Sequence, residues 1–95
     1  MPLTIKWVLS QLSINFKTGE LIWRDNYQRP DLIGQRAGYL NEGYWRLSLG
    51  GVEYYAAQII WFVIYGYIPT KTIDHKDRDK ANDSLFNLRC ATKGQ

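Results

Sequence analysis

The chain has 95 residues, a formal net charge of +3 and 45% hydrophobic residues, which suits one small globular domain with a modest core. It contains no apolar run long enough to span a bilayer and no signal-peptide pattern, so we expect neither a membrane protein nor a secreted one. The single cysteine, Cys90, excludes an intramolecular disulfide and fits a reducing cytoplasm. The mild positive charge permits binding to nucleic acid without requiring it.

The N-terminal quarter is predicted to form a helix followed by a hairpin. The stretch after Pro2 has the spacing of an amphipathic helix capped by Thr4, with apolar side chains at Ile5, Val8, Leu9 and Leu12. Gly19 then separates two apolar, β-favouring runs, which is typical of a hairpin turn. Residues 25–35 are rich in polar residues, glycine and proline and are expected to form a connecting loop.

A small antiparallel β-meander is expected next. Residues 44–49 alternate between apolar and polar side chains, and Gly50-Gly51 turns this strand into a second one at 52–55. One face should join the core, and the other carries Tyr44, Arg46 and Ser48. Those residue types contact nucleic acid well, but they also suit a sheet face that is simply in water, and the pattern leaves both interpretations open.

The next segment, residues 56–65, is apolar on most sides and therefore predicts a central, buried helix that Gly66 ends. The last quarter is predicted to contain two short strands, at about 71–74 and 88–91, joined by a polar loop with a turn of helix near 84–86. Cys90 is interpreted as a half-buried residue of the second strand, although a reactive thiol is the alternative.

An Asp-His pair followed by a spaced asparagine carries the chemistry of this quarter. Asp74 precedes His75, the chain's one histidine, and Asn87 follows twelve residues later. A carboxylate, a general base and an amide that holds the base are parts of a hydrolytic metal site. Neighbouring strand residues face opposite sides, so Asp74 and His75 should not bond each other unless the strand ends or kinks there. A lone histidine on a short strand is more often structural, and the dipeptide alone is weak evidence.

The surrounding sequence resembles the HNH endonucleases of phage and homing type. The likeness rests on Asp74-His75, the polar loop and Asn87-Leu88-Arg89. It extends upstream to Thr18-Gly19-Glu20, Gly43-Tyr44-Trp45-Arg46-Leu47 and the segment 61–69. It thus covers nearly the whole chain as one domain, with residues 1–55 as a helix plus β-meander that would grip DNA and residues 56–95 as the HNH-like part.

The resemblance implies an α+β fold that ends in an incomplete ββα-metal finger. It implies metal-dependent hydrolysis of DNA, with Asp74 as a ligand of Mg²⁺ or Mn²⁺, His75 as the general base and Asn87 as the asparagine of the motif. The partner would be double-stranded DNA in the cytoplasm, that of the host cell if a phage encodes the protein. The residues expected along the DNA are Tyr44, Arg46, Lys76, Arg78, Lys80, Arg89 and Lys93.

Three departures from the family pattern keep an alternative open. Gln58 stands where the family has His-Arg, and Asn82-Asp83-Ser84 stands where it has Asp-Asn-Arg. The second metal ligand would fall at or just beyond Gln95, so the ion would be weakly held if the chain ends there. The alternative is a catalytically silent relative that binds DNA or a protein partner, as a phage regulator or an inhibitor of host defence. A third interpretation is a small α+β domain whose polar loop merely faces water.

Overall fold

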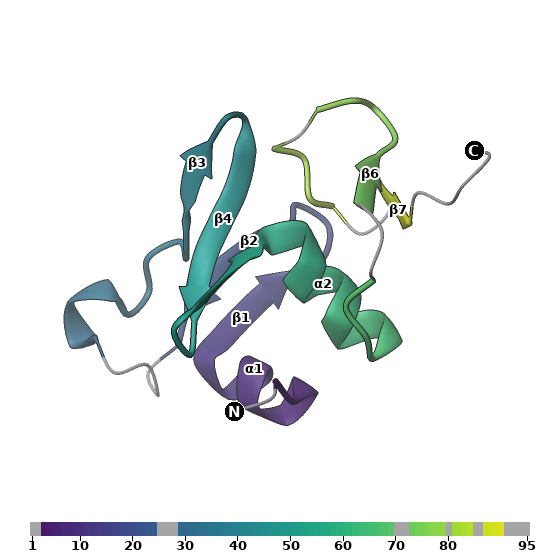
Figure 1. Ribbon diagram of the computed structural model, residues 1–95. Coiled ribbons are helices and arrows are strands. Elements are labelled where there is room, and N and C mark those ends of the chain that lie inside the picture. Colours follow the sequence, from purple (N-terminus) through teal and green to yellow (C-terminus); the bar gives the residue numbers. More distant parts are fainter. Residues whose placement is uncertain (1–2, 25–28, 70–72, 80, 85–86, 91–95) are drawn as a thin grey trace.

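The computed structural model describes residues 3–24, 29–69, 73–79, 81–84 and 87–90. Helices and small antiparallel sheets alternate along this α+β chain, as expected, and the strands form three separate sheets, β1–β2, β3–β4–β5 and β6–β7. In Figure 1, α1 lies at one end of the molecule and the β6–β7 pair at the other, with α2 between them. None of the helices in the described part is long and apolar enough to cross a membrane.

The first helix, α1 (Ile5–Gln11), starts at the predicted cap, because the Thr4 side chain accepts a hydrogen bond from the backbone of Trp7. It ends one residue earlier than the apolar spacing indicated. Leu12, expected as the last helical contact, is extended and begins β1 (Leu12–Asn15), where it is 1% exposed. Burial of its side chain in the core is satisfied equally well by a strand, which is why spacing alone placed it wrongly.

A hairpin links β1 to β2 (Glu20–Trp23), with Leu12 opposite Trp23 and Asn15 opposite Glu20. A single 3₁₀ turn, η1 (Pro30–Leu32), follows in the predicted connecting loop. The segment after this turn comes back to the hairpin, since the backbone N–H of Ala37 donates to the Leu21 carbonyl at 2.6 Å. The hairpin is therefore tied to the loop that leads into the next sheet.

The predicted meander is confirmed as β3 (Tyr39–Asn41), β4 (Tyr44–Leu49) and β5 (Val52–Tyr55). The alternation along β4 is also confirmed towards its end, where Leu47 and Leu49 are buried and Ser48 is exposed. This alternation directs one face of the sheet to the core and leaves the other face partly in water.

The central helix, α2 (Ala56–Tyr65), begins directly after β5. Its first half is buried, with Ile59 and Ile60 both fully inaccessible, and joins the core that α1, β1, β2 and β4 also line. The expectation that the whole helix is buried is wrong for its last turn, where Ile64 is 42% and Tyr65 is 52% exposed. Apolar composition predicted burial all round, but no described element covers that end of the helix.

The last sheet pairs β6 (Ile73–His75) with β7 (Leu88–Cys90), and we call this hairpin and its loop the finger. Register places Asp74 opposite Arg89 and His75 opposite Leu88. The strand prediction of 71–74 stopped one residue short, because His75 is itself paired; positions 71, 72 and 91 lie outside the described residues, as does part of the helical turn expected at 84–86. Buried Ile73 and Leu88 fix the finger to the core.

Candidate active site

His75 ends β6 and turns its ring inward, where it meets a carboxylate from the polar loop. The ring is 6% exposed, and its Nε2 lies 2.8 Å from Oδ1 of Asp83, which is itself 2% exposed. A carboxylate accepts hydrogen bonds, so this contact assigns the ring proton to Nε2. Two polar groups buried together at this distance form a pair whose geometry the surrounding packing fixes.

The second ring nitrogen of His75, Nδ1, remains open. In the described part of the chain it has no hydrogen-bond partner, and it is not among the buried polar atoms that lack one. It is therefore the ring nitrogen whose lone pair no described residue uses, in a side chain that is 6% exposed. A nitrogen in that state can accept a proton from water, which is what a general base does.

Asp74 faces the other side of β6, as strand geometry requires. Its Oδ2 accepts a hydrogen bond from Nε of Arg89 at 3.0 Å and lies 2.9 Å from Nη2 of the same guanidinium, across the paired strand. The carboxylate is 46% exposed, so this ion pair is at the surface and weak. Asp74 and His75 thus do not bond each other, and each has its own partner.

Asp74 offers the type of ligand atom that a hard divalent cation prefers, but the described residues around it offer too few such ligands. A half-exposed carboxylate is the oxygen ligand that Mg²⁺ and Mn²⁺ prefer. Among the residues that the structure describes, however, no cluster of three His, Cys, Asp or Glu side chains is able to hold a metal. Asp74 can supply one ligand, and the position at which the sequence predicted a second lies outside the described residues.

Asn87 does not reach the His75 ring; it holds the loop that follows it. Its Oδ1 accepts from the backbone of Asp77 at 3.0 Å, and its Nδ2 donates to Asp77 Oδ1 and to the Asn82 carbonyl at 2.9 and 2.8 Å. The amide therefore bonds the loop backbone and not the base itself. The loop starts with a tight turn, in which Arg78 donates to the His75 carbonyl and has a φ of 65°.

Asp77 is the centre of the loop's hydrogen bonds. Hydrogen bonds from the Asn82 side chain, the Asp79 backbone and the Asn87 side chain hold the pKa of the Asp77 carboxyl below its ordinary value. The carboxylate is therefore charged at neutral pH and organises donors from three places. The polar run that the sequence showed as a mixed-charge segment is thus an ordered loop closed by side chains.

The β-meander approaches the finger through its aromatic residues. The Tyr44 ring lies 6.0 Å from the His75 ring and 5.3 Å from the Tyr55 ring, and the Arg46 guanidinium lies over Tyr55 at 5.1 Å. Two of the residues predicted to contact DNA, Tyr44 and Arg46, therefore lie on the sheet that borders His75. Arg46 is only 30% exposed and also lies 3.9 Å from Glu53, which reduces the positive charge it presents.

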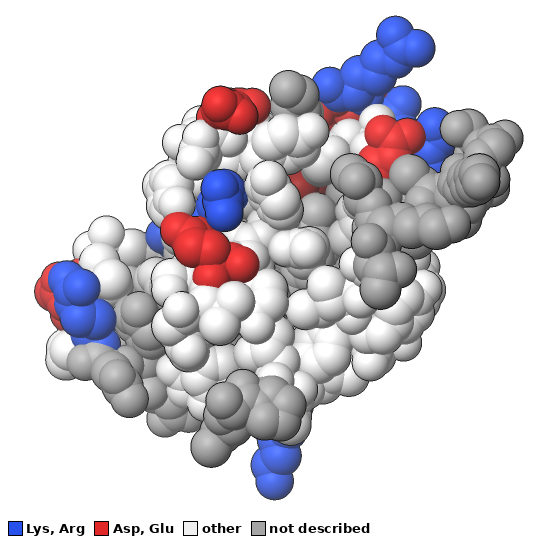
Figure 2. Space-filling view, in the orientation of Figure 1, with Lys and Arg blue, Asp and Glu red and all other residues white. Residues whose placement is uncertain are grey.

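The Lys and Arg side chains coloured in Figure 2 do not form one continuous patch on the face shown; they are scattered, and several lie next to Asp or Glu side chains. Lys76 and Arg78 are exposed on the finger loop, and Arg89 is exposed beside Asp74. Lys80 and Lys93 lie outside the described residues. Among the residues predicted to contact DNA, the exposed cations that the structure describes are Lys76, Arg78 and Arg89, all on the finger.

Sequence reasoning missed the role of Asp83. Asp83 was recognised only as an aspartate at a position where the family has asparagine. Nothing in the sequence indicated that its carboxylate would reach His75, eight positions earlier. The departure from the family pattern at Gln58 has a local explanation: the Gln58 side chain accepts from the Tyr55 backbone at 2.8 Å and so caps the start of α2.

Comparison with known proteins agrees with this geometry. Residues 54–95 match a family model described as HNH endonuclease. The chain is also similar to a solved structure described as "DNA binding and cleavage by the HNH homing endonuclease I-HmuI", with a TM-score of 0.65 and 25% sequence identity. The match covers 98% of this chain and 53% of the other, so the chain spans about half the length of that protein. No curated protein sequence matches the chain.

Proposed function

We propose that this chain, which belongs to the HNH endonuclease family through residues 54–95, hydrolyses phosphodiester bonds of double-stranded DNA with His75 as the general base. The observation that carries the proposal is the state of the His75 ring. Nε2 contacts Asp83, so Nδ1 is the nitrogen without a described partner, and Asp74 directly precedes His75 on the same strand.

The reaction follows from what the two nitrogens can do. Nδ1 takes a proton from a water molecule, the water oxygen forms a bond to phosphorus, and the bond from phosphorus to the leaving oxygen breaks. The leaving oxygen takes its proton from solvent, and the imidazolium later returns its proton to solvent. Nε2 keeps its proton throughout, because Asp83 accepts its hydrogen bond.

Asp74 is the residue that would hold a divalent cation in this reaction. Mg²⁺ or Mn²⁺ fits an exposed carboxylate, and such an ion supplies charge stabilisation at the leaving oxygen. Arg89 occupies Oδ2 of the same carboxylate, so an ion would bind at Oδ1 or displace the guanidinium. Asn87 serves the site indirectly, by fixing the loop between His75 and Asp83.

Duplex DNA is the proposed substrate, and the finger is the proposed contact. Lys76 and Arg78 on the loop are exposed, and neither makes an ion pair with a described residue. Tyr44 and Arg46 are proposed to enlarge this DNA-contacting surface, because the Tyr44 ring lies beside the His75 ring and Arg46 lies on the same sheet. Arg89, Lys80 and Lys93 are proposed to add contacts to the DNA backbone, which would position the duplex without reading its sequence.

A cleavage assay with supercoiled plasmid and Mg²⁺ or Mn²⁺ tests the proposal directly. Replacing His75 by alanine should lower the cleavage rate about 10²- to 10⁴-fold, since a general base contributes that much. DNA affinity should change less than threefold. Asp31→Ala is the control, because the Asp31 side chain is exposed on η1 and its described partner is Arg29, also at the surface. Equal cleavage by the wild type and His75→Ala would remove the assigned mechanism.

One observation favours the silent alternative: Arg89 forms an ion pair with the carboxylate proposed to hold the metal, and the described residues contain no group of three potential metal ligands. Calorimetry with Mn²⁺ separates the two functions. Binding that is lost in Asp74→Ala supports the endonuclease. Salt-sensitive binding of DNA without any metal binding or cleavage would instead support a DNA-binding relative that has lost catalysis.

A further inference from the structure

We infer that Asp83 is a positioning residue for the base, which holds His75 with Nε2 protonated and Nδ1 directed outward. This inference rests on the proposed function, because it concerns the same histidine. The inference goes beyond that function because it gives Asp83, which stands where the family has asparagine, a role in the reaction. Asp83 does not touch the substrate and acts only through the ring.

The geometry of the pair supports an orienting role. Oδ1 of Asp83 lies 2.8 Å from Nε2, and both side chains are more than nine-tenths buried. An imidazole in a buried site can rotate or exchange its proton between nitrogens unless one nitrogen is fixed. A carboxylate fixes it more firmly than a neutral amide, since hydrogen bonds with an ionised partner are roughly twice as strong.

The second oxygen of Asp83 indicates that stability is not the reason for its burial. Oδ2 is buried and has no hydrogen-bond partner in the described part of the chain. A carboxylate with one unsatisfied oxygen is costly to bury, and each such group in a folded protein calls for an explanation. Contact with the catalytic ring provides one, because the remaining oxygen of the same group is the atom that meets Nε2.

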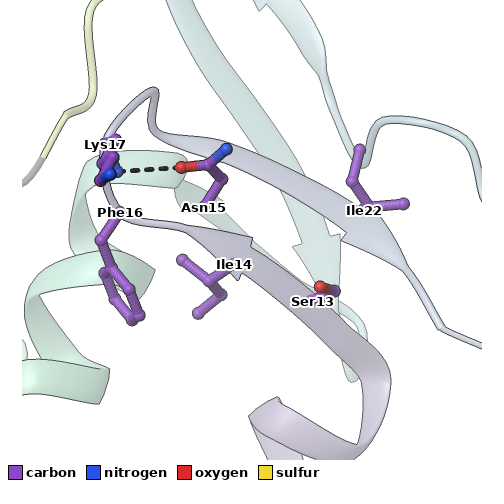
Figure 3. Close-up of a pocket in the computed structure, with 6 residues that line it drawn as sticks. All are labelled: Ser13, Ile14, Asn15, Phe16, Lys17 and Ile22. Atoms are coloured by element: carbon purple, nitrogen blue, oxygen red, sulfur yellow. Dashed lines mark hydrogen bonds between the residues drawn. The ribbon is translucent and has the colours of Figure 1, made fainter.

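The backbone at Asp83 is held in place by the β1–β2 hairpin. A Cβ on Gly19 would lie 2.6 Å from the Asp83 Cβ and 2.7 Å from its Cα, so the hairpin turn packs directly against the backbone of Asp83. The turn is itself built by Asn15, whose side chain accepts from the backbone of Lys17 at 3.0 Å and of Thr18 at 3.3 Å. Figure 3 shows the Asn15–Lys17 bond at the edge of a surface hollow on this hairpin.

This packing extends the site to the N-terminal part of the chain. The hairpin reaches the finger loop from behind α2 (Figure 1), although the two are separated by more than sixty positions in sequence, as between Gly19 and Asp83. A rigid turn on one side and the His75 ring on the other leave the Asp83 carboxylate little freedom. The carboxylate can therefore act as a fixed acceptor.

Nitrogen-15 NMR of the ring is the direct test, and the chain suits it because His75 is its only histidine. The spectrum of the wild-type protein should show one protonated and one unprotonated ring nitrogen, with a slowly exchanging proton on Nε2. In Asp83→Ala that proton should exchange rapidly. Asp83→Asn should keep it, since an amide oxygen still accepts. An Nε2 proton that is equally protected in Asp83→Ala would overturn the inference.

Cleavage kinetics supply the second readout. Asp83→Ala should lower kcat about 10- to 100-fold, the usual loss when the partner of a functional histidine is removed, while KM for DNA stays within about twofold. Asp83→Asn should recover part of kcat. A loss in KM alone, or equal kcat in all three proteins, would contradict a positioning role. Thermal unfolding of each variant, with Asp31→Ala as the control, shows whether the fold is retained.

The two readouts separate failure of the inference from failure of the function. If the wild type does not cleave DNA with either metal, the proposed function fails, and the NMR result still decides whether Asp83 fixes the ring. If the wild type cleaves and Asp83→Ala cleaves as fast with an unprotected Nε2 proton, the function stands and the positioning role is wrong.

Discussion

The side chain of Asn87 connects the second finger strand to the loop that follows the first. All of its hydrogen bonds go to Asp77 and to the Asn82 carbonyl, and the side chain is buried at 9% exposure. An amide suits this position because it donates and accepts at once, and aspartate or leucine would each leave a backbone group unsatisfied. Asn87 therefore stabilises the loop next to the site and is not itself a reacting group in this interpretation.

Replacing Asn87 by alanine should lower the free energy of unfolding by about 2–4 kcal/mol, because several buried hydrogen bonds are lost together and leave a backbone N–H of the loop without a partner. The measurement is urea unfolding followed by tryptophan fluorescence. Asn82→Ala is the matched control: it removes an exposed donor to Asp77 and a long, 3.3 Å acceptor contact with the Ser84 backbone, and it should cost less, about 1 kcal/mol. Equal losses in the two variants would contradict the assigned role.

The elements were largely predictable from the sequence, and the contacts between them were not. Period-two alternation in β4 and apolar spacing in α1 and α2 are local signals, so both helices and the meander could be found. Leu12 and the exposed end of α2 were misplaced because burial depends on what packs against them. The Asp74-His75 pair was visible, but the contact of His75 with Asp83 depends on the path of a loop that no local pattern encodes.

The contact between the β1–β2 turn and the finger leads to a prediction about two glycines. Gly19 and Gly34 have almost the same left-handed φ, 81° and 84°, but only Gly19 has neighbours within 4 Å of an added Cβ. Gly34→Ala should therefore cost only backbone strain, about 1–2 kcal/mol. Gly19→Ala adds a clash with the Asp83 backbone and should cost about 2–5 kcal/mol in total.

The free energies of unfolding of the two glycine variants should be measured in parallel with their cleavage rates. Gly19→Ala should also lose activity under conditions where it is fully folded, since the clash displaces Asp83. Gly34→Ala should cleave at the wild-type rate when folded. If Gly19→Ala destabilised the protein no more than Gly34→Ala, the hairpin would not restrain the finger loop.

At the scale of the whole molecule, the distribution of charge bears on how the proposed DNA substrate would be held. A net charge of +3 with nine acidic residues gives a weak overall field, and Figure 2 shows no continuous basic surface on the face that it presents. Under the proposed function, binding would then use the local cations of the finger loop and the aromatic edge of the meander. We expect modest affinity for this chain and a small number of phosphate contacts.

The finger loop should account for about two of those contacts. The double substitution Lys76→Gln and Arg78→Gln should weaken binding to all duplex sequences alike and reduce the slope of log K against log salt by about 2, since each phosphate contact contributes about 0.9. Lys6→Gln is the control, because Lys6 is exposed on α1 at the opposite end from the finger. Fluorescence anisotropy with a labelled duplex at several salt concentrations gives both slopes. An unchanged slope in the double variant would show that the duplex does not contact the finger loop. A smaller slope in Lys6→Gln would indicate that the duplex binds at the α1 end instead.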